Sequence, residues 1–115
     1  KANAFRHALW NVFIAKQCSL FSRKSHEIIL WTKEFTDWHE EFSPNEELPR
    51  LMDLHNNCIG RELFLKTPKN THKQWISLMK EQLHYAVQIV SAEEVANFPR
   101  QLVYLESRKK KFKIS

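Results

Sequence analysis

The sequence predicts an all-α fold, a compact bundle of four main helices plus a short fifth helix, with the N-terminal helix buried at its centre. Only one of the 115 residues is glycine, whereas tight hairpins, barrels and phosphate-cradling loops need glycine at several positions of positive φ. Apolar residues recur at steps of three and four, which is the spacing of a helix face. At this length, one domain can build a core without disulfides or a metal.

The first helix is expected over residues 3–21, where Asn3 can cap the N-terminus. Its apolar residues surround the helix axis, so this helix should be buried on most sides and should carry His7 and Asn11 into the core. The second helix is expected over residues 25–42, with apolar residues at alternating steps of three and four. This stripe should face the core and consists of Ile28, Trp31, Phe35, Trp38 and Phe42.

A linker closed by prolines precedes a third helix, which should run from residue 49 or 50 to residue 65. Gly60 inside that helix costs about 1 kcal/mol relative to alanine, which indicates close helix packing or the close approach of a ligand. After a break at residues 66–70, a fourth helix capped by Thr71 is expected to continue to Val90, with its apolar residues, Val90 included, turned inward.

A short fifth helix should begin with a capping box at Ser91 and end before Pro99. Residues 102–105 are the one segment that the sequence favours as extended. Residues 1–107 should therefore form a single helical domain, followed by a basic C-terminal tail at residues 108–115.

Positive charge is concentrated in that tail. The net charge is +5 and the isoelectric point is about 9.4, and without the tail the remaining charge is close to neutral. The tail should be solvated, or should contact nucleic acid, an anionic membrane or an acidic protein partner. Its basic residues are Arg108, Lys109, Lys110, Lys111 and Lys113.

No apolar run approaches the roughly 18 residues that cross a bilayer, and no charged-then-apolar leader opens the chain. Because the chain also lacks an initiating methionine, we expect a soluble domain of a longer polypeptide, which could be secreted or delivered with it. Cys18 and Cys58 lie among apolar residues without a CxxC spacing, which favours free buried thiols over a disulfide.

Eleven residues in the middle of the chain, 52–62, hold an acid, an imidazole, two carboxamides and a guanidinium along the third helix. Aspartate and asparagine are poor residues inside helices, because their side chains compete for backbone hydrogen bonds. Such a local conflict is expected at a functional site, although a structural polar network leaves the same mark. Asp53 and Asn57 share a helix face, as do Asn57 and Arg61, whereas His55 points toward the core.

Two other segments offer matching groups, His7 with Asn11 on the first helix and His39 with Glu40 near the end of the second. We expect the three segments to converge on one buried polar site, which would suit Zn²⁺ or Mn²⁺ in a helical hydrolase. Glu40 would be the general base for a metal-bound water, and Arg61 would neutralise an oxyanion or phosphate. The proposed metal ligands are His7, His39, Asp53 and His55, and the proposed orienting residues are Asn11, Asn56 and Asn57.

Two alternatives stay open. A histidine paired with aspartate or asparagine could act without metal, as in lipid hydrolysis on helices. Residues 4–11 resemble the Arg-His-Asp-Phe stretch of small bacterial phospholipases A2, with Ala8 in place of the aspartate. The second alternative is a non-catalytic interaction module, in which the buried histidine, asparagine and aspartate network only fixes helix geometry and the basic tail docks a partner.

Three motifs together resemble an uncharacterised bacterial domain family: Asn-Ala-Phe-Arg-His-Ala-Leu-Trp-Asn at 3–11, Trp-His-Glu at 38–40 and Met-Asp-Leu-His-Asn-Asn-Cys-Ile-Gly-Arg at 52–61. Members of that family occur as stand-alone proteins and as C-terminal domains of secreted, toxin-like polypeptides. The resemblance does not bring an established activity with it, but its toxin-like context favours, by analogy, a hydrolase acting on nucleic acid, phospholipid or cell-wall material. The motif positions that it implies are His7, Asn11, His39, Glu40, Asp53, His55, Asn56, Asn57, Gly60 and Arg61.

The sequence therefore predicts a small bacterial hydrolase domain with a divalent metal, acting on a phosphodiester or phospholipid at a site between the first three helices. An anionic substrate, either nucleic acid or phospholipid, is the expected ligand.

Overall fold

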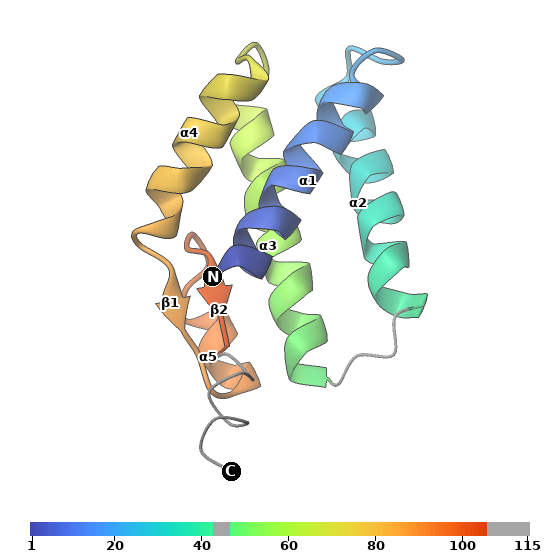
Figure 1. Cartoon of the computed structure of the whole chain (residues 1–115). Coiled ribbons are helices and arrows are strands. Elements are labelled where there is room, and N and C mark those ends of the chain that lie inside the picture. The colour runs from blue at the N-terminus through green and yellow to red at the C-terminus, as the bar shows by residue number, and fades with distance from the viewer. Residues whose placement is uncertain (43–46, 106–115) are drawn as a thin grey trace.

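The computed structural model describes residues 1–42 and 47–105. As predicted, the chain is a mostly helical bundle, to which a very small parallel sheet is added (Figure 1). The basic tail lies outside the described residues. The helices are α1 (Ala2–Cys18), α2 (Ser25–Phe42), α3 (Glu47–Lys66), α4 (His72–Leu83) and α5 (Ala92–Ala96), and the strands are β1 (Val87–Gln88) and β2 (Val103–Tyr104).

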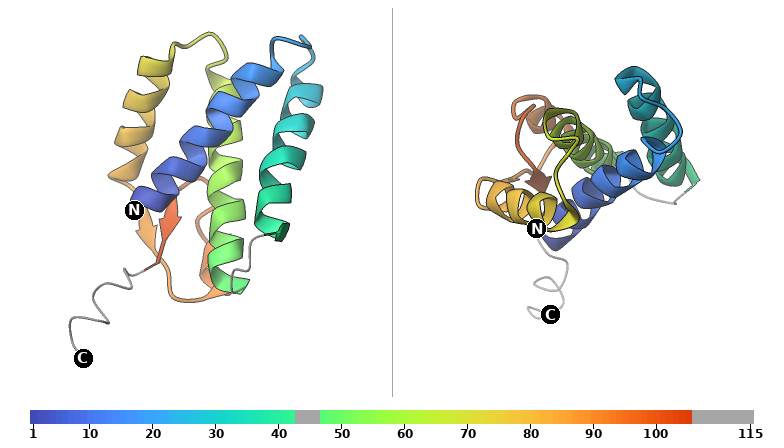
Figure 2. Two further views of the ribbon diagram at one scale, coloured as in Figure 1. Left: turned by 45° about the vertical axis from the view of Figure 1, so that its right-hand side comes forward. Right: turned by 90° about the horizontal axis from the view of Figure 1, so that it is seen from above.

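Helix α1 lies at the centre of the bundle, crossing α3 with α2 on one side and α4 on the other (Figure 2). Its buried apolar face consists of small residues, Ala4, Ala8, Val12 and Ala15. Small side chains let two helix backbones approach closely, and Gly60 on α3 completes the contact. A Cβ built on Gly60 would lie 2.0 Å from the carbonyl oxygen of Ala8, so close helix packing explains this glycine.

The boundaries of α2 agree with the sequence-based expectation, and Thr71 caps α4 through a reciprocal capping box with Gln74. Helix α3 begins two residues earlier than expected, at Glu47. Helix α1 is shorter than expected, because the chain turns after Cys18.

Helix α4 ends at Leu83, so its expected extension to Val90 was wrong. The reason is pairing with a distant segment, since the backbone N–H of Val87 donates to the carbonyl of Leu102 at 2.9 Å. Val87 and Val103 are register partners in the parallel pair. Val90, expected to face inward, is 75% exposed.

The segment from β1 to β2 wraps the N-terminal half of α3 and forms a second, smaller core with it. Buried residues of this cluster come from α3, from the end of β1 and from β2, namely Met52, Ile89 and Val103. The main core joins α1, α3 and α4 around Trp75 and Met79, which are fully buried. None of the described helices is long and apolar enough to cross a membrane.

The expected inward stripe of α2 was wrong for its aromatic residues. Trp31, Phe35 and Trp38 are 38%, 47% and 52% exposed, and the face that packs on the bundle carries Thr32 and Thr36, both fully buried. These two hydroxyls donate to the carbonyls one helical turn earlier, at 2.8 Å in each case. Because each hydroxyl is paired within its own helix, a polar face can be buried and the aromatic face is left at the surface.

Candidate functional site

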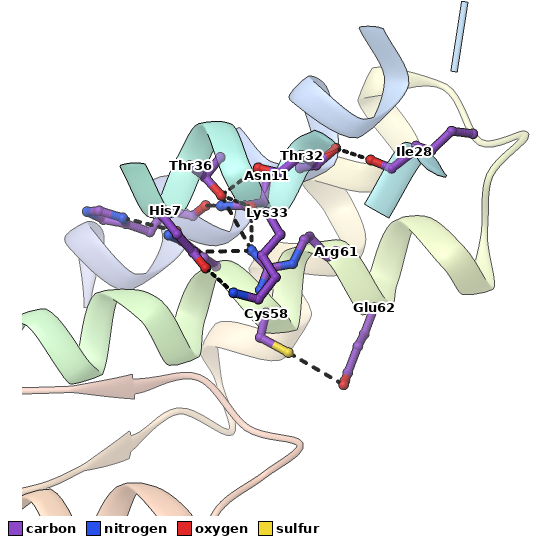
Figure 3. Close-up of polar contacts among 11 residues, drawn as sticks. His7, Asn11, Ile28, Thr32, Lys33, Thr36, Cys58, Arg61 and Glu62 are labelled. Atoms are coloured by element: carbon purple, nitrogen blue, oxygen red, sulfur yellow. Dashed lines mark hydrogen bonds and ion pairs between the residues drawn. The ribbon is translucent and has the colours of Figure 1, made fainter. Parts of the chain in front are cut away.

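A buried polar network joins α1, α2 and α3, with Arg61 at its centre (Figure 3). The Nη1 atom of Arg61 donates to Oδ1 of Asn11 at 3.1 Å and lies 3.7 Å from Oδ1 of Asp37. The single hydroxyl hydrogen of Thr36 is shared between the Thr32 carbonyl, at 2.8 Å, and Oδ1 of Asn11, at 2.9 Å, while the amide of Asn11 donates to the carbonyl of His7. Each helix thus supplies a polar group to the same interface, and the guanidinium is held on several sides.

One helical turn further along α1, His7 meets the third helix. Its Nε2 lies 3.6 Å from Oδ2 of Asp53, and its Nδ1–H donates to Oδ1 of Asn57 at 3.2 Å. The other carboxylate oxygen of Asp53 accepts from the amide of Asn3 at 3.0 Å. Asp53 and Asn57 are on the same face of α3 because they are four residues apart, which is why one imidazole can reach both.

Asn57 has a buried amide that needs explanation. The residue is fully buried, and its Nδ2 has no hydrogen-bond partner among the described residues. A buried donor without a partner costs about 1–3 kcal/mol, and such groups commonly face a bound water or ligand. Its Oδ1 accepts from Nδ1–H of His7, and Nε2 of the same ring faces a carboxylate. Nδ1–H of His7 is thus bonded to the carboxamide, while Nε2 is turned toward the carboxylate of Asp53.

His7 also reaches the surface, where it lines a shallow pocket of about 240 Å³ with Asn3, Arg6 and Trp10. The His7 side chain is 19% exposed, whereas that of Asp53 is 7% exposed. Arg6 is exposed at the same pocket. The pocket therefore combines a partly buried imidazole with a cation and an indole ring, and the imidazole in turn faces the carboxylate of Asp53.

His55 and Asn56 face a different part of the molecule. Nε2 of His55 donates to the carbonyl of Gln101 at 2.7 Å. Asn56 bonds both backbone groups of Val103, donating to the carbonyl at 2.8 Å and accepting from the N–H at 3.0 Å. The structure thus uses these two predicted site residues to hold β2 and the residues before it against α3.

The expected metal ligands are only partly brought together. His7 and Asp53 are neighbours, His55 is bonded elsewhere, and the side chains of His39 and Glu40 lie outside the described part of the structure. Among the side chains that the structure describes, those of residues 1–38 and 47–105, no group of three or more His, Cys, Asp and Glu residues is arranged to hold a metal ion. His7 and Asp53 can offer one nitrogen and one oxygen donor.

Sequence analysis missed several members of the site. Thr36 and Asp37 complete the Arg61 network, and Asn3 and Arg6 line the pocket. Asn3 lies one helical turn before His7, and Arg6 directly precedes it. Their positions in the helix could therefore have indicated that they lie near the imidazole. For Thr36 the signal in the sequence was weaker. It lies four residues after Thr32, so the two threonines share a helix face and mark that face as polar.

The comparison with family models identifies the chain's family. Residues 1–87 match the model described as a domain of unknown function, DUF6973. The match covers more than half of the 115 residues, so the chain belongs to this family. It includes every residue of the Arg61 network and of the His7 pocket. No curated protein and no solved structure matches the chain significantly.

Proposed function

We propose that this domain is a hydrolase of anionic esters, either phosphodiesters or phospholipids, with the imidazole of His7 at its reaction centre. One observation carries the proposal: His7 lines a surface pocket while its two ring nitrogens meet a buried carboxylate and a buried carboxamide. Histidine is the side chain best suited to proton transfer near neutral pH, and a carboxylate partner orients it and stabilises its charged form. The family motifs make a bacterial, toxin-like origin part of the same proposal.

The proposed roles follow from the contacts. Asp53, held by Asn3, orients the imidazole and stabilises the imidazolium. Nε2 is the nitrogen that would transfer the proton, because Nδ1 is bonded to Asn57 at 3.2 Å while Nε2 faces Oδ2 of Asp53 at 3.6 Å. The unpaired Nδ2 of Asn57 would donate to a water or substrate oxygen admitted beside the ring.

Arg6 takes the anion-binding role that the sequence suggested for Arg61. Arg61 is 6% exposed, and its guanidinium is bound to Asn11, Thr36 and Asp37. Arg6 is exposed at the mouth of the pocket beside His7. A guanidinium at this place can form two parallel hydrogen bonds to a phosphate without first giving up buried partners.

A divalent metal, Zn²⁺ or Mn²⁺, remains part of the proposal. His7 and Asp53 would be two of its ligands, and His39 would be a third, with Glu40 as the general base. A bound metal would supply a water molecule that ionises near neutral pH. In the metal-free form of the proposal, His7 itself removes the proton from water.

The test is a hydrolysis assay on a bis-aryl phosphodiester, a single-stranded oligonucleotide and a phosphatidylcholine dispersion. We expect His7→Gln and Asp53→Asn to lower kcat/KM at least about 100-fold, the usual contribution of general acid–base catalysis. The matched control is His26→Gln, an exposed histidine of α2. Chelation with metal analysis separates the two forms, because only the metal form loses activity and metal together.

A non-catalytic interaction module is the second candidate, favoured by the Arg61 network, in which the guanidinium already contacts Asn11, Thr36 and Asp37. In that case His7 would only stabilise the contact between α1 and α3. Absence of turnover on all three substrates, with a lower melting temperature for His7→Gln than for His26→Gln, would support the module and contradict the hydrolase.

A further inference from the structure

Three aromatic residues form a row at the surface of α2: Trp31, Phe35 and Trp38, which are 38%, 47% and 52% exposed. Their spacing of four and three places them on one face of the helix. We call these three residues the aromatic row. Large apolar groups left in water are unfavourable, and a contiguous exposed patch marks an interaction surface.

The aromatic row borders the His7 pocket. The ring of Phe35 makes an edge contact with Trp10, with centroids 5.9 Å apart, and Trp10 makes an edge contact with His7 at 6.5 Å. Trp10 is also a wall of the pocket. A ligand surface lying on the row would therefore extend to the imidazole and to Arg6.

Further exposed apolar side chains lie elsewhere on the α1–α2 hairpin. Leu20 and Phe21 in the connection between the helices are 67% and 82% exposed, and Leu30 on α2 is 50% exposed. In the described part of the chain, the exposed large apolar residues outside this hairpin are Leu65, Tyr85 and Val90. Most of the exposed large apolar residues in the described part of the chain thus lie on α2 and in its connection to α1, and these two helices lie side by side (Figures 1 and 2).

The charge of α2 argues against a polyanion on the aromatic row itself; the other cations of the hairpin, such as Arg6, Arg23 and Lys24, lie on α1 and in the connection. The described side chains of α2 include three carboxylates, Glu27, Glu34 and Asp37, against one lysine, and Lys33 is paired with Asp37 at 2.5 Å. Single-stranded nucleic acid binds where aromatic stacking is combined with a positively charged groove. A zwitterionic lipid surface needs no such groove, and tryptophan and phenylalanine favour the boundary between acyl chains and water.

We propose that the α1–α2 hairpin docks on zwitterionic phospholipid, with the aromatic row and Phe21 at the lipid boundary. The inference rests on the proposed hydrolase function and names its substrate class, because docking would bring the phosphodiester of a lipid headgroup to Arg6 and His7. Trp10 would lie between the docked surface and the imidazole.

The experiment is sedimentation with sucrose-loaded phosphatidylcholine vesicles. We expect the double variant Trp31→Ala/Trp38→Ala to partition at least about tenfold more weakly than the wild type, since each exposed indole would be lost from the lipid boundary. Tyr85→Ala, which removes an exposed ring outside the hairpin, should partition as the wild type does. Phe21→Ser is a second variant on the hairpin. Because the Phe21 side chain is 82% exposed, the substitution does not disturb the core, and we expect it to weaken partitioning about threefold.

Several outcomes would overturn the inference: a wild-type protein that does not sediment with the vesicles, unchanged partitioning of both hairpin variants, oligonucleotide binding that depends on Trp31 and Trp38, or a dimer that the double variant dissociates. Failure of the proposed function is distinguishable. Vesicle binding without any hydrolysis supports the docking surface and contradicts the hydrolase. Hydrolysis of a soluble phosphodiester without vesicle binding overturns only the docking surface.

Discussion

Arg61 shows how a residue with a typical functional side chain can serve structure. Arg61 is 6% exposed and donates hydrogen bonds to Asn11 and Thr36, while Asp37 balances its charge. Removing one member of a buried ion pair leaves the other charge without compensation, which destabilises a protein more than the pair itself stabilises it. The matched comparison is Arg6, an exposed arginine on α1.

We predict that Arg61→Met lowers the free energy of unfolding by about 2–4 kcal/mol. The loss is limited because the Asp37 carboxylate is partly exposed and retains its ion pair with Lys33. Arg6→Met should change it by less than about 0.5 kcal/mol, as is usual for a surface substitution. Urea unfolding of both variants checks this. Equal stability losses, or the reverse order, would contradict the assigned roles.

Cys58 provides a prediction about chemical reactivity. Burial raises the pKa of its thiol above the ordinary value, an effect that the nearby Arg61 guanidinium opposes, while Glu62 adds to the increase. The thiol also donates to the Glu62 carboxylate at 3.7 Å. Because the thiolate is the reactive form, alkylation of Cys58 by iodoacetamide at pH 8 should be slower than that of free cysteine. The rate measured in Cys18→Ser protein tests this, and a rate above that of free cysteine would exclude the raised pKa.

Among the elements, the starts of α2 and α4 were the most predictable features, whereas Asn3 does not cap α1, which begins at Ala2, and Ser91 makes no side-chain cap on α5. Ser25 begins α2 and Thr71 caps α4 as expected, because capping depends on residues within one turn. The end of α4 was not predictable, since residues 87–88 leave the helical pattern only because they pair with residues 103–104. Local periodicity contains no information about a partner that lies fifteen or more residues away.

Asn56 holds the second strand in place. Its carboxamide makes two hydrogen bonds to the backbone of Val103, and both residues are fully buried. Asn56→Ala should therefore lower the free energy of unfolding by about 2–3 kcal/mol, because it leaves two buried backbone groups without partners. Hydrogen exchange at the Val103 amide should accelerate, whereas in Asn97→Ala, an exposed control, it should not. Unchanged protection of that amide would contradict the role of Asn56.

The contact between α1 and α3 depends on Gly60. Alanine would gain about 1 kcal/mol in helix propensity, but its Cβ would lie 2.0 Å from the carbonyl oxygen of Ala8. The helices must then move apart, and we predict that Gly60→Ala lowers the free energy of unfolding by more than about 2 kcal/mol. A circular-dichroism melt beside Cys58→Ala, on the same helix, measures the effect. A stabilised Gly60→Ala would disprove the close contact.

At the scale of the whole molecule, the sequence was sufficient for the all-α bundle and for part of the candidate site. Spacing alone places Asp53, Asn57 and Arg61 along one side of α3, and places His7 and Asn11 together on α1. It does not reveal which helix lies opposite a given face. For that reason, two features became known only from the structure. His55 bonds to the backbone at residue 101, and Thr36 and Asp37 join the Arg61 network.

The family match ends at residue 87, but the described core continues beyond it. Leu102 and Val103 are fully buried, and Leu102 belongs to the main core. Truncation after residue 88 should therefore lower the melting temperature strongly, whereas truncation after residue 105 keeps every described contact and should leave it nearly unchanged. A melt of the two truncated chains checks this. Equal melting temperatures would show that the segment 89–105 does not contribute to stability.

Whether His7 and Asp53 act as one reacting unit can be measured with a double-mutant cycle on hydrolysis. The variants are His7→Gln, Asp53→Asn and the two combined, each compared with the wild type by kcat/KM. If the two residues act together, kcat/KM of the combined variant should be no lower than that of the less active single variant, because the second substitution removes no further catalytic contribution. Losses that multiply, as expected for independent residues, would contradict the account.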